Sequence, residues 1–225
     1  MAFALPAGAQ QSATTIDPSP GEQQEAPKEQ QPGSTDRLFW TLPNFLTVEH
    51  AELAQPLSSR QKFSIVTRSA FDFVEFGWYG FLAGLDQEEN SEPGYGPGTG
   101  GYLKRYASEF ADGTIENFMV GAVLPSVFHQ DPRYYQLGQG SVWHRAGYSV
   151  SRILVTRTDG GHRQFNASEI FGSAATAVIS NAYHPSGARG VANTMTTWWS
   201  QMGYDAVTTV VKEFWPDIRR RFRRH

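Results

Sequence analysis

The chain of 225 residues contains no cysteine, so disulfides and thiolate metal sites are excluded. Its formal net charge of −3, with no basic stripe in the body of the chain, argues against a nucleic-acid partner. No stretch of about 20 consecutive strongly apolar residues is present, so no transmembrane helix is predicted. The HExxH, GxSxG and P-loop signatures are missing as well, and no cofactor is predicted.

The first 36 residues offer little to bury. Residues 1–9 look like the remnant of a secretory signal peptide, because Ala7-Gly8-Ala9 fits the small-residue pattern that precedes cleavage. Residues 10–36 are rich in Gln, Pro, Ser, Glu and Gly, which predicts a disordered linker. We expect the true start codon to lie upstream, with export to the periplasm or the outer-membrane periphery. The alternative is a disordered, Ala-rich cytosolic tail.

Residues 37–218 are predicted to form a single domain, because apolar residues recur there at the three- and four-residue steps of helix faces. We predict an all-α fold, a compact bundle of about five helices rich in Gly, Ala and aromatic residues. The expected helices cover residues 58–85, 102–128 with a break at Gly113 or Pro125, 142–156, 166–183 and 191–214. Residues 153–165 are also compatible with a short β-hairpin.

A polar cluster follows the apolar run that ends at residue 128. It contains His129, Asp131, Arg133 and Tyr134. As a site, His129 beside a carboxylate is a workable general base, and Arg133 can clamp a phosphate or carboxylate with two hydrogen bonds. As a structural element, Asp131 begins a turn, and His129 and Arg133 satisfy carbonyl groups at a helix end. Both interpretations remain open at this point.

Two stripes of charged residues occur at helical spacing in the first two predicted helices. The first stripe contains Arg68, Asp72 and Glu75, and the second contains Arg105, Glu109, Asp112 and Glu116. Charges at this spacing usually mark a solvated face. If the stripes face one another, they form a buried network of carboxylates that could act as acids and bases or bind a divalent metal ion. Asp72 and Glu75 are the candidate metal ligands.

A single pocket would unite these features. Asn181 and His184 lie at the end of the predicted fourth helix, where they could line the same cavity as His129. In this hypothesis, Arg105 and Arg133 offset the carboxylates of Glu109 and Asp112, because unpaired buried acids cost several kcal/mol. Tyr134, Asn181 and His184 would help Arg105 to bind an anionic substrate.

Several sequence blocks resemble an uncharacterised family of exported bacterial helical proteins. They are GYG at residues 94–96, GYLKRY at 101–106, HQDPRYY at 129–135 and NAYHP at 181–185. The resemblance covers most of residues 38–214 and implies a location outside the cytoplasm, but no activity. A fainter similarity is to YfiM-like putative envelope lipoproteins, although the lipoprotein cysteine is absent here.

Two functions of different classes are compatible with the sequence. An aromatic share of 13% and an arginine-rich tail over residues 219–225 suit contact with a membrane surface. The first hypothesis is therefore a non-enzymatic envelope protein that packs against a membrane or another envelope protein. The alternative is a membrane-associated enzyme acting on a lipid or cell-wall headgroup, with His129 as general base and Arg133 or Arg105 as anion clamp.

Overall fold

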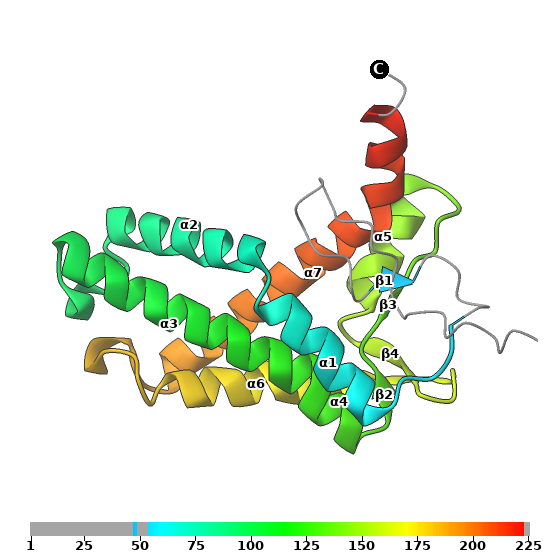
Figure 1. The fold of residues 1–225 in the computed structure, drawn as a ribbon, viewed down its shortest axis with the longest axis horizontal. Helices are drawn as coiled ribbons and strands as arrows, with labels where there is room; N and C mark the ends of the chain where they lie inside the picture. The colour runs from blue at the N-terminus through cyan, green and yellow to red at the C-terminus, as the bar shows by residue number, and fades with distance from the viewer. Residues whose placement is uncertain (1–46, 49–53, 223–225) are drawn as a thin grey trace, which may run out of the picture. The chain divides into compact units, whose positions relative to one another are not determined.

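The computed structural model describes residues 47–48 and 54–222 (Figure 1). The predicted signal remnant, the linker and the last three residues of the tail lie outside these ranges. The described part is mostly helical, which confirms the predicted fold class. Its α-helices are α1 (Ser59–Ala70), α2 (Phe73–Glu89), α3 (Gly98–Phe118), α4 (Leu124–Val127), α5 (Val142–Ser151), α6 (Ala167–Ser180) and α7 (Val191–Phe222).

The predicted first helix is divided into α1 and α2 by a break at Phe71 and Asp72. Ser58 caps α1 in a reciprocal arrangement with Gln61, which satisfies two amide groups that have no partner inside the helix. The Asp72 carboxylate accepts from the Val74 amide at 3.1 Å and so caps α2. This cap fixes Asp72 at the junction rather than in the middle of a continuous charged stripe.

Helix α3 runs directly through a π-helical turn, η3 (Met119–Val123), into α4. The expected break at Gly113 does not occur. The wider π turn lies immediately before Pro125, whose ring nitrogen cannot donate to the preceding turn. Other helices approach closely here, since a Cβ added at Gly121 would lie 2.7 Å from Cγ2 of Val66 in α1. At Gly172 of α6, a Cβ would lie 2.8 Å from the side chain of Val120.

Helix α7 extends further than the apolar pattern predicted, from Val191 to Phe222 with Pro216 inside it. Arg219, Arg220 and Arg221 therefore form the last helical turn, and the predicted tail is a helix end as far as Phe222. Positive charge at this position is favourable, because the carbonyl ends of the helix carry partial negative charge.

The hairpin predicted within residues 153–165 is confirmed. Strand β4 (Val155–Thr158) pairs antiparallel with β5 (Arg163–Phe165), and β2 (Gln130–Asp131) adds a third strand along β4. A second small sheet joins β1 (Thr47–Val48) in parallel to β3 (Tyr134–Tyr135). These short strands connect the end of α4 with the segment around α5.

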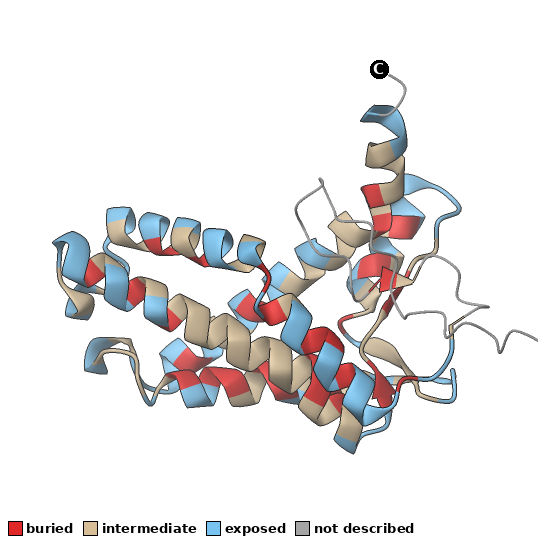
Figure 2. Ribbon diagram, viewed as in Figure 1, coloured by how far each residue is buried: buried red, intermediate tan, exposed pale blue. Residues whose placement is uncertain are grey.

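Helix α3 lies at the centre of the helical part, with α2 on one side and α6 on the other (Figure 1). Helix α7 packs on both α6 and α5. Few positions of α2 are buried (Figure 2), and of its 17 residues only Tyr79 and Ala83 fall in that class. None of the described helices combines the length and apolarity that a bilayer crossing requires.

Candidate functional site

Carboxylates from four helices point into the space between α2, α3, α6 and α7. We call them the interior carboxylate cluster: Glu75, Glu109, Asp112, Glu116, Glu169 and Asp205. The two predicted stripes meet at Tyr79, which is buried on α2 and packs so closely on α3 that a Cβ at Gly113 would clash with its hydroxyl. Arg68 remains exposed and does not join the cluster.

The centre of the cluster is formed by Glu116, Glu169 and Asp205. Burial and the nearby carboxylates of Asp205 and Asp112 raise the pKa of Glu116 to about 9. Burial and repulsion from Asp205 raise the pKa of Glu169 well above its ordinary value, and burial also raises that of Asp205. The carboxyl groups of Glu169 and Asp205 lie within hydrogen-bonding reach, so a proton on one can be donated to the other.

Several polar atoms in this interior have no hydrogen-bond partner among the described residues. They are Glu116 Oε1, Gln201 Oε1 and Trp198 Nε1. Lys212 is a cation that interacts with this group; burial lowers its pKa, while attraction to Asp205 and Glu169 opposes that shift. The interior therefore holds more acids than bases, and protonation replaces ion pairing as the means of keeping them buried.

His184 closes one end of the cluster. Its Nδ1 lies 2.8 Å from Glu92 Oε1, and its Nε2 lies 2.8 Å from Asp112 Oδ2. Tyr183 donates its hydroxyl proton to Asp112 Oδ1. Burial lowers the pKa of His184, but its hydrogen bonds to Asp112 and Glu92 outweigh that effect and raise the pKa to about 10. His184 is therefore an imidazolium held between two carboxylates.

Glu109 and Arg105 lie on α3 near this end. Burial and repulsion from Asp112 raise the pKa of Glu109 to about 7. Arg105 does not pair with Glu109: its Nε lies 2.8 Å from Asp86 Oδ2, and it also donates to the carbonyls of Glu92 and Gly96. Since its guanidinium holds the turn between α2 and α3, the predicted role of Arg105 as an anion clamp is not supported by its contacts.

The predicted cluster after α4 has the geometry of a turn. Arg133 forms a two-fold ion pair with the buried Asp131, Nε to Oδ1 at 2.9 Å and Nη2 to Oδ2 at 2.7 Å. The Asp131 carboxylate also accepts from the Arg133 amide at 3.0 Å and the Tyr135 hydroxyl at 2.6 Å. His129 is exposed with a left-handed φ of 54°, and its carbonyl accepts from the Asp159 amide.

The single pocket that the sequence suggested is not formed. The continuous helix from Asp112 to Val127 separates its two ends by about 22 Å at 1.5 Å per residue, and His129 lies beyond that end. Arg133 pairs with Asp131 and not with Glu109 or Asp112. Asn181 donates to Thr194 Oγ1, which joins the end of α6 to α7. Of the predicted residues, Glu75, Glu109, Asp112 and His184 belong to the interior, whereas His129, Asp131 and Arg133 do not.

Glu213 is a second buried carboxylate, and the sequence did not identify it as important. It is fully buried and accepts from the Tyr134 hydroxyl, the Leu137 and Gly138 amides and Arg145 Nε, all within 2.7–2.9 Å. Burial opposes ionisation, but these hydrogen bonds outweigh it and lower the pKa of Glu213. The available signal was its position three residues after Val210, on the otherwise apolar face of α7.

The described residues contain no group of three or more histidine and acidic side chains arranged to hold a metal ion. The Asp72 carboxylate, one of the two candidate ligands, instead caps α2. The buried acids of the cluster can take up and release protons. Comparison with protein-family models, curated proteins and solved structures finds no match to this chain, so its function has to be argued from its own residues.

Proposed function

We propose that this chain is an exported envelope protein whose helical part lies in contact with the apolar layer of a membrane. The observation that carries the proposal is the distribution of charge on four helical stretches. In residues 73–85, 106–127, 167–182 and 190–211, every charged side chain is buried or half-buried. Proteins surrounded by water normally have the opposite arrangement, with charges on the outside.

Large apolar side chains occupy exposed positions of the same helices. They are Phe73, Phe76, Trp78, Phe81 and Leu85 on α2, Phe171, Val178 and Ile179 on α6, and Val191, Met195, Trp199, Tyr204 and Val207 on α7. Exposed charges occur nearby only outside these stretches, at Glu88, Glu89, Lys104 and Arg189 among others. An apolar surface of this extent, bordered by charge, is typical of a surface that binds a membrane or another protein.

A lipid layer is favoured over a second copy of the chain because the apolar surface is not confined to one side. Helices α2 and α6 lie on opposite sides of α3 (Figure 1), and both carry exposed aromatic residues. One dimer interface would cover only one of these sides, whereas lipid can contact both. The arginines at the end of α7 add attraction to anionic headgroups, worth about 1 kcal/mol each near the surface.

Vesicle flotation of the full chain tests the contact. The triple variant Phe81→Gln, Val178→Gln and Val207→Gln removes apolar groups from α2, α6 and α7, and we expect affinity for phosphatidylcholine vesicles to fall at least about tenfold. The matched control is Val142→Gln, Val150→Gln and Leu154→Gln, which removes exposed apolar groups near α5. Equal binding of the two variants would contradict the proposal. Loss of a lipid-free dimer in the first variant alone would assign the surface to a second copy.

Export is the part of the proposal that rests on the sequence, through Ala7-Gly8-Ala9 and the resemblance to exported proteins. N-terminal sequencing of the native protein tests this directly, since an intact Met1 would contradict cleavage. The enzymatic alternative required His129 and Arg133 to meet the stripes of Asp72 and Asp112 around one pocket, and the contacts of His129 and Arg133 do not favour it.

A further inference from the structure

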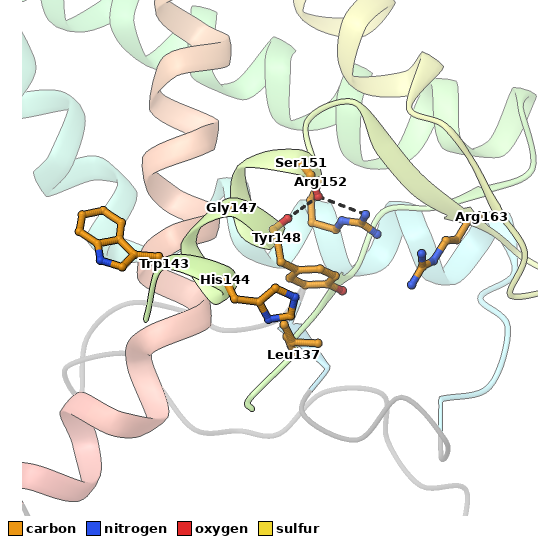
Figure 3. Close-up of a pocket in the computed structure, with 8 residues that line it drawn as sticks. All are labelled: Leu137, Trp143, His144, Gly147, Tyr148, Ser151, Arg152 and Arg163. Carbon is orange, nitrogen blue, oxygen red and sulfur yellow. Dashed lines mark hydrogen bonds between the residues drawn. The ribbon is translucent and has the colours of Figure 1, made fainter. Parts of the chain in front are cut away.

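A cavity lies beside α5, away from the interior carboxylate cluster. It is open to solvent and has a volume of about 570 Å³, within the range of small-molecule sites. Its lining combines the apolar surfaces of Leu137 and Tyr148 with the cations Arg152 and Arg163 (Figure 3). Both guanidinium groups lie on the same side of the Tyr148 ring, whereas Trp143 points away from them.

The guanidinium of Arg152 has few hydrogen-bond partners at this position. Its guanidinium carbon lies 4.6 Å from the centre of the Tyr148 ring, and its Nη2 donates to Ser151 Oγ at 3.3 Å. Its Nε is buried and has no hydrogen-bond partner among the described residues. A guanidinium carries five N–H donors, so most of those of Arg152 remain available to a ligand.

The neighbourhood contains a surplus of positive charge. Arg163 and Arg157, which are paired across β4 and β5, both act on Arg152 as like charges. Within residues 54–222, none of these three arginines forms an ion pair with a carboxylate. Arg133 and Arg145 differ, since each is neutralised by its own acid. Arg152 and Arg163 line the cavity, and the guanidinium of Arg157 lies over the Tyr135 ring instead. The two unneutralised guanidinium groups of the lining repel one another and are stabilised when an anion binds between them.

We propose that this cavity binds a phosphate group, with Arg152 and Arg163 as its ligands and Leu137 and Tyr148 in contact with an apolar part of the same molecule. Phosphate matches two guanidinium forks in charge and in hydrogen-bonding geometry. The phosphate can belong to a soluble phosphomonoester or to a lipid headgroup. The proposal does not depend on the membrane contact of α2, α6 and α7, because the cavity lies beside α5 and the β4–β5 hairpin.

Titration calorimetry with inorganic pyrophosphate and glycerol phosphate provides the soluble arm of the test. Flotation with phosphatidic acid vesicles, compared with pure phosphatidylcholine, provides the lipid arm. We expect the double variant Arg152→Gln and Arg163→Gln to weaken phosphate binding at least about tenfold in the calorimetric or in the vesicle experiment. The control is Arg68→Gln, which removes the same charge from an exposed position of α1 and should leave binding within about twofold.

Two further variants separate an effect on phosphate binding from an effect on folding and from an effect of charge alone. Arg163 is exposed on β5, so Arg163→Gln alone should leave thermal unfolding unchanged while it weakens binding. Arg152→Lys keeps the charge but loses the fork, and it should also weaken binding. Arginine-dependent binding in the soluble arm identifies a soluble phosphate, and binding in the vesicle arm alone identifies a headgroup. Equal losses in Arg68→Gln, or no dependence on Arg152 and Arg163 in either arm, would overturn the proposal.

Discussion

Glu213 and Glu116 are both withdrawn from water, but their surroundings are opposite. Glu213 is fully buried and receives hydrogen bonds on both carboxylate oxygens, including one from Arg145. Glu116 has one oxygen without a partner among the described residues and has other carboxylates as its neighbours. The pKa of Glu213 is consequently lowered, whereas burial raises that of Glu116 to about 9.

The difference shows two ways of keeping an acid inside a protein. Around Glu213, donors from β3, from the segment after β3 and from α5 converge on a charged carboxylate of α7 and tie these elements together. Around Glu116, the acids remain buried by staying protonated, which needs no complementary cation. Protonated interior acids beneath an apolar exterior agree with the lipid contact proposed above, because lipid contributes no water to solvate a charge. Four substitutions test this contrast.

The largest effect is expected at the Glu213 site. Glu213→Ala leaves Arg145 Nε and two backbone amides without their acceptor, and should lower the free energy of unfolding by about 3–5 kcal/mol. The stabilisation by Glu213 is present above pH 4.5 and is lost as the pH falls through its lowered pKa. Denaturant unfolding at pH 7 and pH 3 measures both effects. A loss no larger than that of the exposed Glu88→Ala would show that the hydrogen bonds to Glu213 do not hold α5 on α7.

The next prediction concerns Glu116, where removal of the acid should stabilise the protein. Between pH 4.5 and about 9, the unfolded state ionises while the folded state keeps its proton, so stability falls as the pH rises. Glu116→Gln removes this contribution, about 1.4 kcal/mol per pH unit for one proton, and should raise stability by about 3 kcal/mol at pH 7.

Unfolding curves at pH 5, 7 and 9 measure the difference in slope for Glu116→Gln. The exposed Glu89→Gln is the matched control and should leave the slope unchanged. If Glu116→Gln destabilised the protein at pH 9, the Glu116 carboxylate would have to be ionised and paired. The contrast with Glu213 would then disappear.

Local patterns in the sequence were sufficient to predict much of the fold. Apolar periodicity placed the helices and the turn at Gly160 placed the hairpin, because both depend on neighbours a few residues away. The break before α2 was missed, and the break predicted at Pro125 takes the form of a π turn just before it, since each depends on which helix packs against it as well as on its own residues. The extension of α7 past Pro216 shows the same dominance of packing over local preference.

The sequence was sufficient to predict which helix face carries the buried acids, but not which side chains pair with them. Helical spacing placed Glu109, Asp112 and Glu116 on one side of α3, and that side does face the interior. The partner of Asp112, His184, is 72 positions away, and no local rule joins them. Arg105 and Arg133 were expected to neutralise the interior acids, but Arg133 pairs with Asp131 in its own turn, and Arg105 pairs with Asp86 near the end of the preceding helix. Nearby partners cost less chain entropy, which favours such local pairs.

His184 combines features of both ways of burying an acid, because it is a cation paired with carboxylates at the end of the interior carboxylate cluster. Its raised pKa means that its stabilisation is complete below pH 6.5 and is lost as the pH rises through about 10. His184→Gln should therefore cost about 2 kcal/mol at pH 6, from the loss of charged hydrogen bonds to Asp112 and Glu92, and almost nothing above pH 10.

Proton NMR of the imidazole follows the His184 titration directly. The exposed His162→Gln is the control and should have little effect at either pH. An imidazole that titrates near 6.5 would mean that the two carboxylates do not hold His184 in its charged form. Stability measured between pH 5 and pH 6 separates His184 from Glu116. Of these two residues, only Glu116 makes the free energy of unfolding depend on pH in that range.

The smallest effect is expected at Tyr134, which supplies one of several donors to Glu213. Tyr134→Phe removes the hydroxyl that donates to Glu213 and also lies 3.0 Å from Ser149 Oγ, while Arg145 and the amides of Leu137 and Gly138 still hold the carboxylate. We expect a loss of about 1 kcal/mol in the free energy of unfolding. The exposed Tyr204→Phe should change it by less than about 0.5 kcal/mol. A loss at Tyr134 as large as that of Glu213→Ala would mean that the donors act as one unit. The Glu213 carboxylate would then be stabilised only when all of its donors are present.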